Sequence, residues 1–277
     1  MKKILLLLGL INIFSAFAFP KMKLISGGQY KHDESIIVQE DFFMSETKIT
    51  VAQWSEYIKD ANKGSLNSVY SKMKRIIDER DVKIEDSFPV WGITYVQAAE
   101  FCNWLSDKKN LKKCYAIEKK DGAIVVKTDY AADGYRLPTF QEWFYVSELW
   151  MDRDASYYER VNILKGESTL ERDYPYTVDY EASNSFGIKD PLGNIQELCN
   201  DYYLKNENLK LLGTKKYGPE TFTPDPDQVY FKEPLTAVYV LAGGTHNDTY
   251  EKIKDNLIYD INLLSSDYFS FRVVRRK

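Results

Sequence analysis

Three segments carry hydrophobic residues at helical spacing, and each begins with a Thr that is followed three residues later by Gln or Glu. The pairs are Thr50/Gln53, Thr94/Gln97 and Thr139/Glu142. In such a capping box, the two side chains satisfy backbone groups that the first helical turn leaves without partners. The pattern therefore predicts three short amphipathic helices that begin at these positions.

The apolar positions behind each start fall on one face of the expected helix. Because residues three and four apart lie on the same side of a helix, this spacing predicts a buried stripe. Cys102 is part of the second stripe, which places its thiol in the core. The stripes are Val51, Trp54 and Ile58, then Ala98, Phe101, Cys102 and Leu105, and finally Trp143, Val146 and Trp150.

Strand-like runs are shorter and scattered along the chain. Residues 23–25, 36–38, 123–127, 237–242 and 269–274 are rich in β-branched or aromatic residues, so the chain begins and ends in strands. In two further segments, the hydrophobic residues do not recur at a regular helical or strand spacing. The charged segment at about 59–86 is predicted to be an insertion, and the segment at about 206–234 a long loop. Without a linker or repeat, residues 19–277 are predicted to form one domain.

The N-terminus has the pattern of a secretory signal peptide over residues 1–18. Lys2 and Lys3 precede an apolar run, and Ala16 and Ala18 form a small-residue cleavage site. An uncleaved membrane anchor is the alternative, since the run is long for a signal. Cleavage after Ala18 predicts an exported, periplasmic or extracellular chain, and no later segment is apolar enough to span a membrane.

Composition indicates a globular protein and argues against a nucleic-acid partner. The 277 residues are 44% hydrophobic, which is enough for a large core, and 14% aromatic, which suits irregular loops held by large flat side chains. The 37 basic residues are outnumbered by 41 acidic ones, for a net charge of -4. Such a chain has no broad basic field to attract nucleic acid or anionic lipid.

The cysteines and histidines do not have the spacing of a structural zinc site. The chain has three cysteines, Cys102, Cys114 and Cys199, and two histidines, His32 and His246, with no Cys-x-x-Cys pair. An odd number of cysteines in an exported chain allows at most one disulfide, whose pairing the sequence leaves open. The three thiols are interpreted as structural.

Eight segments, taken in order, resemble one known family. The most specific, Gly-Tyr-Arg-Leu-Pro-Thr-Phe-Gln-Glu-Trp at 134–143, is similar to the family sequence G-Y-R-L-P-T-E-A-E-W. In it, Pro138 gives a rigid entry to a helix and Arg136 can bond loop carbonyls, so both residues are expected to hold the fold. The other segments are 24–28, 45–54, 89–94, 98–106, 184–199, 242–244 and 271–275. The chain thus resembles the formylglycine-generating enzyme (sulfatase-modifying factor) family.

This resemblance implies an α+β domain of the compact C-type-lectin-like fold, with short helices, small antiparallel sheets and much irregular loop. Active members of the family oxidise a substrate cysteine through two cysteines that bind Cu(I), for which soft thiolates are suited. The matching positions here hold Asp248 and Ile253, and no cysteine follows Cys199. Copper and a formylglycine-generating oxidase are therefore disfavoured.

The resemblance also implies a calcium-binding site. A family loop binds this ion through side-chain and backbone oxygens, and Asp190, Gly193, Ile195 and Glu197 match its positions. Carboxylates and carbonyls suit a hard cation. The alternative is that the two acids only cap and solvate a turn. A second family site corresponds loosely to Asn162, Ile163 and Asp173.

Three functions remain open. The first is a binding or accessory module for a protein, peptide or glycan, in which a groove is lined by Thr245, His246, Asn247, Asp248 and Tyr250. The second is an enzyme, either a formylglycine-generating oxidoreductase or another activity in the same groove, with His246, Asp248 and Cys199 as its available ligands. The third is a structural envelope component with a large exposed apolar patch.

Overall fold

A computed structural model gives the architecture of the chain. It describes residues 19–32, 35–63, 69, 71, 73–74, 83–120, 123–148, 175–179, 183–204, 237–245, 248, 259–262 and 269–277. The predicted signal peptide and the predicted loop at about 206–234 lie outside these residues. No helix in the described part is long and apolar enough to cross a membrane.

The three predicted helices are confirmed, each with its capping box. They are α1 (Val51–Asp60), α3 (Tyr95–Lys108) and α4 (Phe140–Ser147), capped by Thr50, Thr94 and Thr139. The predicted stripe of α3 is buried, Cys102 included. Helix α4 ends at Ser147 because Glu148 takes a left-handed conformation with φ 61°. Trp150, the last residue of the predicted stripe, lies outside the described residues.

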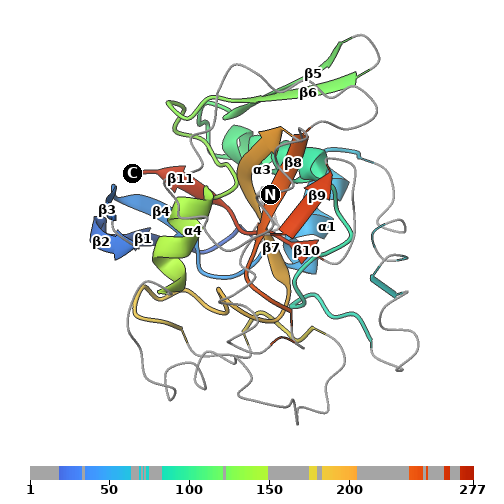
Figure 1. Ribbon diagram of the computed structural model, residues 1–277. Helices are drawn as coiled ribbons and strands as arrows, with labels where there is room; N and C mark the ends of the chain where they lie inside the picture. Colours follow the sequence, from blue (N-terminus) through green and yellow to red (C-terminus); the bar gives the residue numbers. More distant parts are fainter. Residues whose placement is uncertain are drawn as a thin grey trace, which may run out of the picture.

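The strands form two small sheets and two hairpins (Figure 1). The three-stranded sheet has the order β1-β4-β11 and is antiparallel throughout. The four-stranded sheet has the order β10-β7-β8-β9, in which only the β10-β7 pair is parallel. Hairpins β2-β3 and β5-β6 extend from the body. The α+β class is thereby confirmed.

The strand bounds are as follows: β1 Met22–Ile25, β2 Gly28–His32, β3 Ser35–Gln39, β4 Phe42–Ser45, β5 Tyr115–Lys120, β6 Ala123–Thr128, β7 Gln196–Leu204, β8 Ala237–Ala242, β9 Tyr259–Asn262, β10 Phe269–Ser270 and β11 Val274–Arg276. The predicted strand at 237–242 matches β8, and those at 23–25, 36–38 and 123–127 fall within β1, β3 and β6.

The predicted strand at 269–274 is in fact two strands that join the two sheets. β10 pairs with β7, whereas β11 pairs with β4 and so lies beside the N-terminal strands. The crossing between them is held by backbone bonds, from Ser45 N to Val273 O (2.8 Å) and from Ile49 N to Phe271 O (2.8 Å). The C-terminal segment therefore closes the domain against its beginning.

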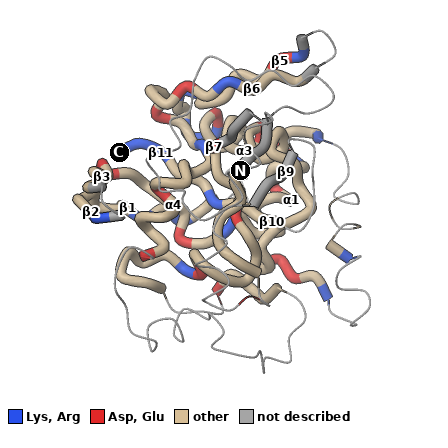
Figure 2. The backbone as a smooth tube through the Cα atoms, viewed as in Figure 1, with Lys and Arg blue, Asp and Glu red and all other residues tan. Residues whose placement is uncertain are grey.

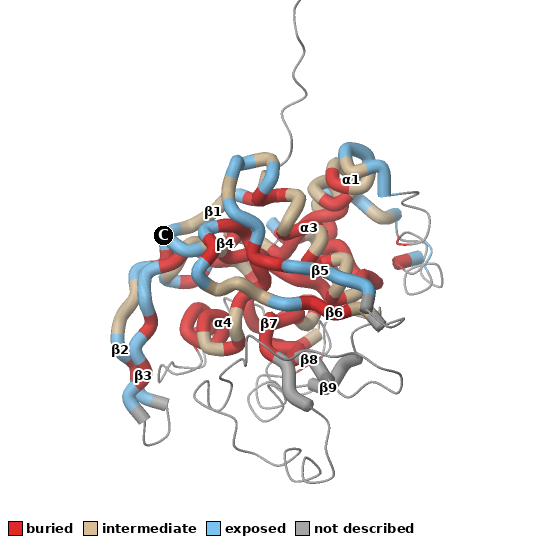
Figure 3. Tube along the Cα trace, turned by 90° about the horizontal axis from the view of Figure 1, so that it is seen from above, coloured by how far each residue is buried: buried red, intermediate tan, exposed pale blue. Residues whose placement is uncertain are grey.

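Two clusters of buried side chains form the core. The larger packs α1 and α3 against the C-terminal crossing, with Trp54 stacked on Phe101 at 5.5 Å and Phe101 edge-on to Phe271 at 5.5 Å. The smaller surrounds α4. The charged segment at about 59–86 also takes part, because Val69 and Met73 are buried in the larger cluster. In Figure 3, α4 and β7 are mostly buried, whereas hairpins β2-β3 and β5-β6 both have exposed stretches.

Candidate functional site

The Gly-Gly turn that the family resemblance identifies follows β8 directly. Gly243 has φ 79°, and a Cβ placed on it would lie 3.3 Å from the carbonyl oxygens of Pro191 and Leu192. Gly244 N donates to Leu192 O at 2.7 Å. The turn is thus packed on the loop that precedes β7, in a conformation that favours glycine.

Asp248, at the first position matched to a copper-binding cysteine, is buried and closes a short turn. Its Oδ2 accepts hydrogen bonds from the backbone N of Thr245 (2.8 Å) and from Thr245 Oγ1 (3.0 Å). Its own N donates to Thr245 O at 3.1 Å. Of the predicted groove, these two residues are therefore brought together. His246, Asn247, Tyr250 and Ile253 lie outside the described residues.

The three cysteines are free thiols in the interior. Burial raises the pKa of Cys102 and Cys199 well above the ordinary value, and it raises that of Cys114 to about 11. A thiol must lose its proton to bind a metal or act as a nucleophile. These three are therefore protonated at neutral pH. The described part of the chain also contains no group of three or more His, Cys, Asp and Glu side chains that could hold a metal.

The segment at 190–197, which runs into β7, places oxygens of three of the four residues predicted to bind calcium around one buried cation, whereas the fourth, Ile195, donates from its N to Gly193 O at 2.8 Å. Asp190 and Asn194 both take positive φ, 55° and 69°, and Asn194 is bonded through its side-chain amide to the backbone N and O of Tyr176. The curled loop brings its oxygens around Nζ of Lys48. That ammonium lies 2.5 Å from Asp190 O, 3.1 Å from Gly193 O and 3.1 Å from Glu197 Oε1.

Glu197 also forms an ion pair with a second cation, Arg272. Arg272 donates from Nε to Oε2 (2.5 Å) and from Nη2 to Oε1 (2.6 Å). Burial by itself raises the pKa of Glu197, but the attraction of Arg272 and Lys48 outweighs it and holds the pKa below the usual range. The three side chains are almost wholly inaccessible to solvent.

The pKa of Asp190 is shifted in the opposite direction from that of Glu197. Burial raises the pKa of its carboxyl in spite of the nearby Lys48 and Arg272. Its Oδ1 has no hydrogen-bond partner among the described residues. Since both oxygens of Glu197 and two loop carbonyls are already held by Lys48 and Arg272, these residues do not fit an added calcium ion. The second predicted calcium site, at Asn162, Ile163 and Asp173, lies outside the described residues.

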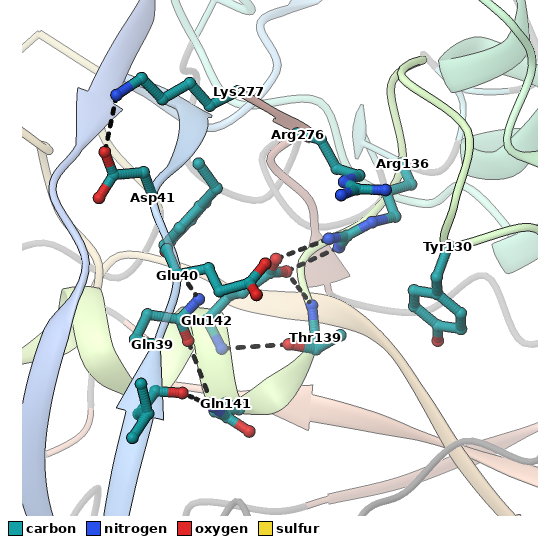
Figure 4. Close-up of a pocket in the computed structure, with 12 residues that line it drawn as sticks. Gln39, Glu40, Asp41, Tyr130, Arg136, Thr139, Gln141, Glu142, Arg276 and Lys277 are labelled. Carbon is teal, nitrogen blue, oxygen red and sulfur yellow. Dashed lines mark hydrogen bonds and ion pairs between the residues drawn. The ribbon is translucent and has the colours of Figure 1, made fainter.

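A surface pocket of about 520 Å³ lies between the β3-β4 turn, the start of α4 and the end of β11 (Figure 4). Within its wall, Arg136 binds Glu142 through two bonds, 2.7 Å from Nη1 to Oε2 and 2.6 Å from Nη2 to Oε1. Arg136 also donates to Leu137 O at 3.1 Å, in keeping with its expected role in holding loops. The lining residues are Val38, Gln39, Glu40, Asp41, Phe42, Tyr130, Arg136, Thr139, Gln141, Glu142, Arg276 and Lys277.

The pocket offers both signs of charge. Lys277 pairs with Asp41 at 2.8 Å on its rim, opposite the Arg136–Glu142 pair (Figure 4). Basic and acidic residues are likewise interspersed over the chain (Figure 2). Sequence reasoning missed this pocket. Its walls come from residues 38–42, 130–142 and 276–277, and only the folded β1-β4-β11 sheet brings residues 276–277 beside residues 38–42.

Strand β7 carries two further buried polar residues that sequence reasoning missed. A register shift against β8 between Leu198 and Tyr202 indicates a bulge, and Cys199, Asn200 and Asp201 are consecutively buried there. Asn200 Oδ1 accepts from the hydroxyls of Tyr95 (3.0 Å) and Tyr115 (2.5 Å). Because three consecutive residues are buried at the bulge, the alternation of apolar and polar residues that marks a half-buried strand is absent here, and the sequence did not reveal these two residues.

Comparison with known proteins shows the family resemblance over nearly the whole chain. The family described as sulfatase-modifying factor enzyme 1-like domain (FGE-sulfatase) matches residues 11–277. A relative, the chaperone protein LppX of Paenibacillus barcinonensis, is 26% identical over 216 residues, which cover 65% of this chain and 71% of that protein.

Three solved structures share the fold. CarF superposes with a TM-score of 0.62 at 17% identity, over 93% of this chain and 98% of that one. The Treponema denticola variable protein 1 superposes with a TM-score of 0.61 at 19% identity, over 92% of this chain and 95% of that one. PvdO from Pseudomonas aeruginosa superposes with a TM-score of 0.56 at 14% identity, over 93% of this chain and 95% of that one. Together with the family match, this likeness shows that the chain belongs to the sulfatase-modifying factor family and has its compact C-type-lectin-like fold.

Proposed function

We propose that this chain is an exported accessory member of the family that binds a partner polypeptide and does not generate formylglycine. The observation that carries the proposal is the state of Asp248. At a position where active members have a copper-binding cysteine, this chain has a buried carboxylate whose Oδ2 is already held by two bonds from Thr245.

The chemistry of the remaining residues supports a non-oxidase role. Cu(I) in this family is held by two soft thiolates, and a carboxylate is a hard ligand. The three thiols of the chain are buried, and burial raises the pKa of each one. Generating a thiolate at any of them would require both exposure to solvent and loss of a proton, so none is suited to the reaction.

A polypeptide partner is supported by the surface around the pocket. Strand β3 exposes Ile36 (72%) and Val38 (61%) on one face, and Val38 also lines the pocket. An apolar pair next to paired charges of both signs can contact apolar side chains and backbone groups of a polypeptide together. The likeness to a protein named as a chaperone supports the same role.

The oxidase alternative is tested with the chain from Phe19 onward. We would incubate it with Cu(I), oxygen and a peptide that carries a sulfatase-type cysteine motif, and follow the peptide mass. We expect no conversion by the folded protein. Formation of formylglycine would show that the chain is a formylglycine-generating oxidoreductase after all and would overturn the proposal.

Partner binding is tested separately, by light scattering of reduced α-lactalbumin as it aggregates. The wild-type chain is expected to delay aggregation, and the double variant Ile36→Ser/Val38→Ser is expected to lose this effect. Leu24→Ser is the matched control, because Leu24 is an exposed apolar residue (46%) of β1 that does not line the pocket. Equal activity of all three proteins would exclude the β3 face as the binding surface.

Export is tested on the protein made in its own cell type. Cell fractionation and N-terminal sequencing are expected to find the chain outside the cytoplasm, beginning at Phe19. A chain that begins at Met1 in the membrane fraction would identify residues 1–18 as a retained anchor.

A further inference from the structure

We propose that the ammonium of Lys48 is a built-in cation that takes the place of a metal ion in the loop at 190–197, so that the conformation of this loop does not depend on calcium. The proposal concerns the architecture of the domain and is independent of the proposed function.

The contacts of Lys48 are those that a bound cation would make. Its Nζ lies among two backbone carbonyls, from Asp190 and Gly193, and one carboxylate oxygen, from Glu197. An ammonium has three N–H donors, which is the number of oxygens around it. The oxygen atoms that would suit a calcium ion are therefore already bound by an ammonium group of the same chain.

Backbone hydrogen bonds fix the position of Lys48 in the fold. It lies between β4 and α1, where the next residue, Ile49, donates from its N to Phe271 O (2.8 Å) and accepts at its O from Val90 N (2.8 Å). The loop is fixed to the same segment, because Lys189 N donates to Glu46 O at 2.8 Å. Both partners of the contact are thus held by backbone hydrogen bonds.

The charges around the loop also argue against an added cation. Lys48 and Arg272 are buried on the same carboxylate, Glu197, and Arg272 reaches the loop carbonyl of Lys189 at 3.1 Å. A divalent ion at the same oxygens would lie beside two buried positive charges. In an interior of low dielectric constant, such repulsion is strong.

The first test uses the wild-type chain and needs no variant. Native protein is acetylated at its lysines with an N-hydroxysuccinimide ester, in EDTA or in 5 mM CaCl₂, and digested for mass spectrometry. Lys48 is expected to react at least ten times more slowly than the exposed Lys63 in both conditions. Acetylation of Lys48 that appears only with calcium would mean that the ion displaces the ammonium, and it would overturn the proposal.

The second test compares thermal stability. The Tm of the wild type is expected to be the same in EDTA and in calcium, whereas Lys48→Met is expected to melt several degrees lower in EDTA and to recover part of that loss with calcium. Lys63→Met, which removes an exposed lysine paired with Glu100, is the matched control and should behave as wild type. A calcium-dependent rise in the wild-type Tm that Glu197→Gln abolishes would overturn the proposal.

Discussion

The backbone N of Phe140 donates a hydrogen bond of 2.5 Å to Oδ2 of Asp201, so a carboxylate from β7 caps the first turn of α4. Asp201 is buried in the β7 bulge, without an ion-pair partner among the described residues. Burial raises the pKa of its carboxyl to about 7, although the bond from Phe140 works in the opposite direction. This contact joins the four-stranded sheet to the helix that borders the pocket.

Asp201 is expected to make the protein less stable as the pH rises from about 4 to 7. Its pKa is higher in the folded chain than in the unfolded one, so the folded state keeps a proton that the unfolded state has lost, and stability falls until the pH passes about 7. The effect is on the order of 4 kcal/mol at most. Asp201→Asn, which keeps an acceptor for Phe140, should remove this part of the pH dependence of Tm.

Asp129→Asn serves as the control for that experiment, because Asp129 is half-exposed and its pKa is lowered by Lys112 and by backbone hydrogen bonds. It should leave the wild-type slope between pH 5 and 7 unchanged. If Asp201→Asn also melts with the wild-type slope, the Asp201 carboxyl is ionised throughout this range and the prediction is wrong.

The buried pair of Arg136 and Glu142 is expected to be essential for stability. Glu142→Ala would leave the guanidinium buried without its partner and would remove the N3 side of the α4 capping box, at a cost of about 3–5 kcal/mol in the free energy of unfolding. Urea denaturation measures this loss. Lys113→Ala removes a half-exposed pair with Asp107 and should cost less than about 1 kcal/mol. Equal effects of the two changes would contradict the assignment.

Gly27 is expected to fix the β3-β4 turn that forms one wall of the pocket. A Cβ at Gly27 would lie 2.1 Å from Gln39 O and 2.7 Å from the carbonyl carbon of Glu40, both backbone atoms. Gly27→Ala should therefore displace the turn and destabilise the protein by roughly 1–3 kcal/mol.

The neighbouring Gly28→Ala is a matched control for Gly27→Ala. Its Cβ would lie 3.1 Å from the hydroxyl of Tyr145, a contact that a shift of a few tenths of an ångström would relieve, and it would meet no backbone atom. Thermal melts of the two variants should differ by several degrees. Wild-type stability of Gly27→Ala would show that the turn is not held against this glycine.

The three thiols are expected to be nearly unreactive in the native protein. Ellman's reagent attacks through the thiolate, and burial raises the pKa of Cys102, Cys114 and Cys199. Native protein should therefore react slowly, whereas protein in urea should release all three thiols. Rapid reaction of any cysteine under native conditions would reveal an accessible thiolate and would weaken the argument for a non-oxidase role.

The local parts of this fold could be predicted because they depend on neighbours in sequence. The capping boxes at Thr50, Thr94 and Thr139 are three-residue patterns, and each begins a helix as predicted. The stripe that buries Cys102 follows from helical spacing alone. The ordered segments also identified the family, which the match over residues 11–277 confirmed.

The tertiary structure alone decided how the polar residues of β7 are used. The sequence from 196 to 204 has no alternating pattern, and it was not predicted to be a strand. Glu197, Asn200 and Asp201 are buried because each meets a partner from a distant segment, respectively Arg272, two tyrosines and the N of Phe140. Burial of a polar group is tolerated when such partners are present, and a linear pattern does not contain them.

The same reason explains the loop at 190–197 and the pocket. The sequence determined that Asp190, Gly193 and Glu197 would gather on one loop, and it determined the oxygen chemistry of that loop. That the ammonium of Lys48, 142 residues before Asp190, would lie among those oxygens was decided by the folding of β4, α1 and the C-terminal crossing around it. Spacing along a chain specifies which groups can act together, whereas only packing specifies which group fills the space between them.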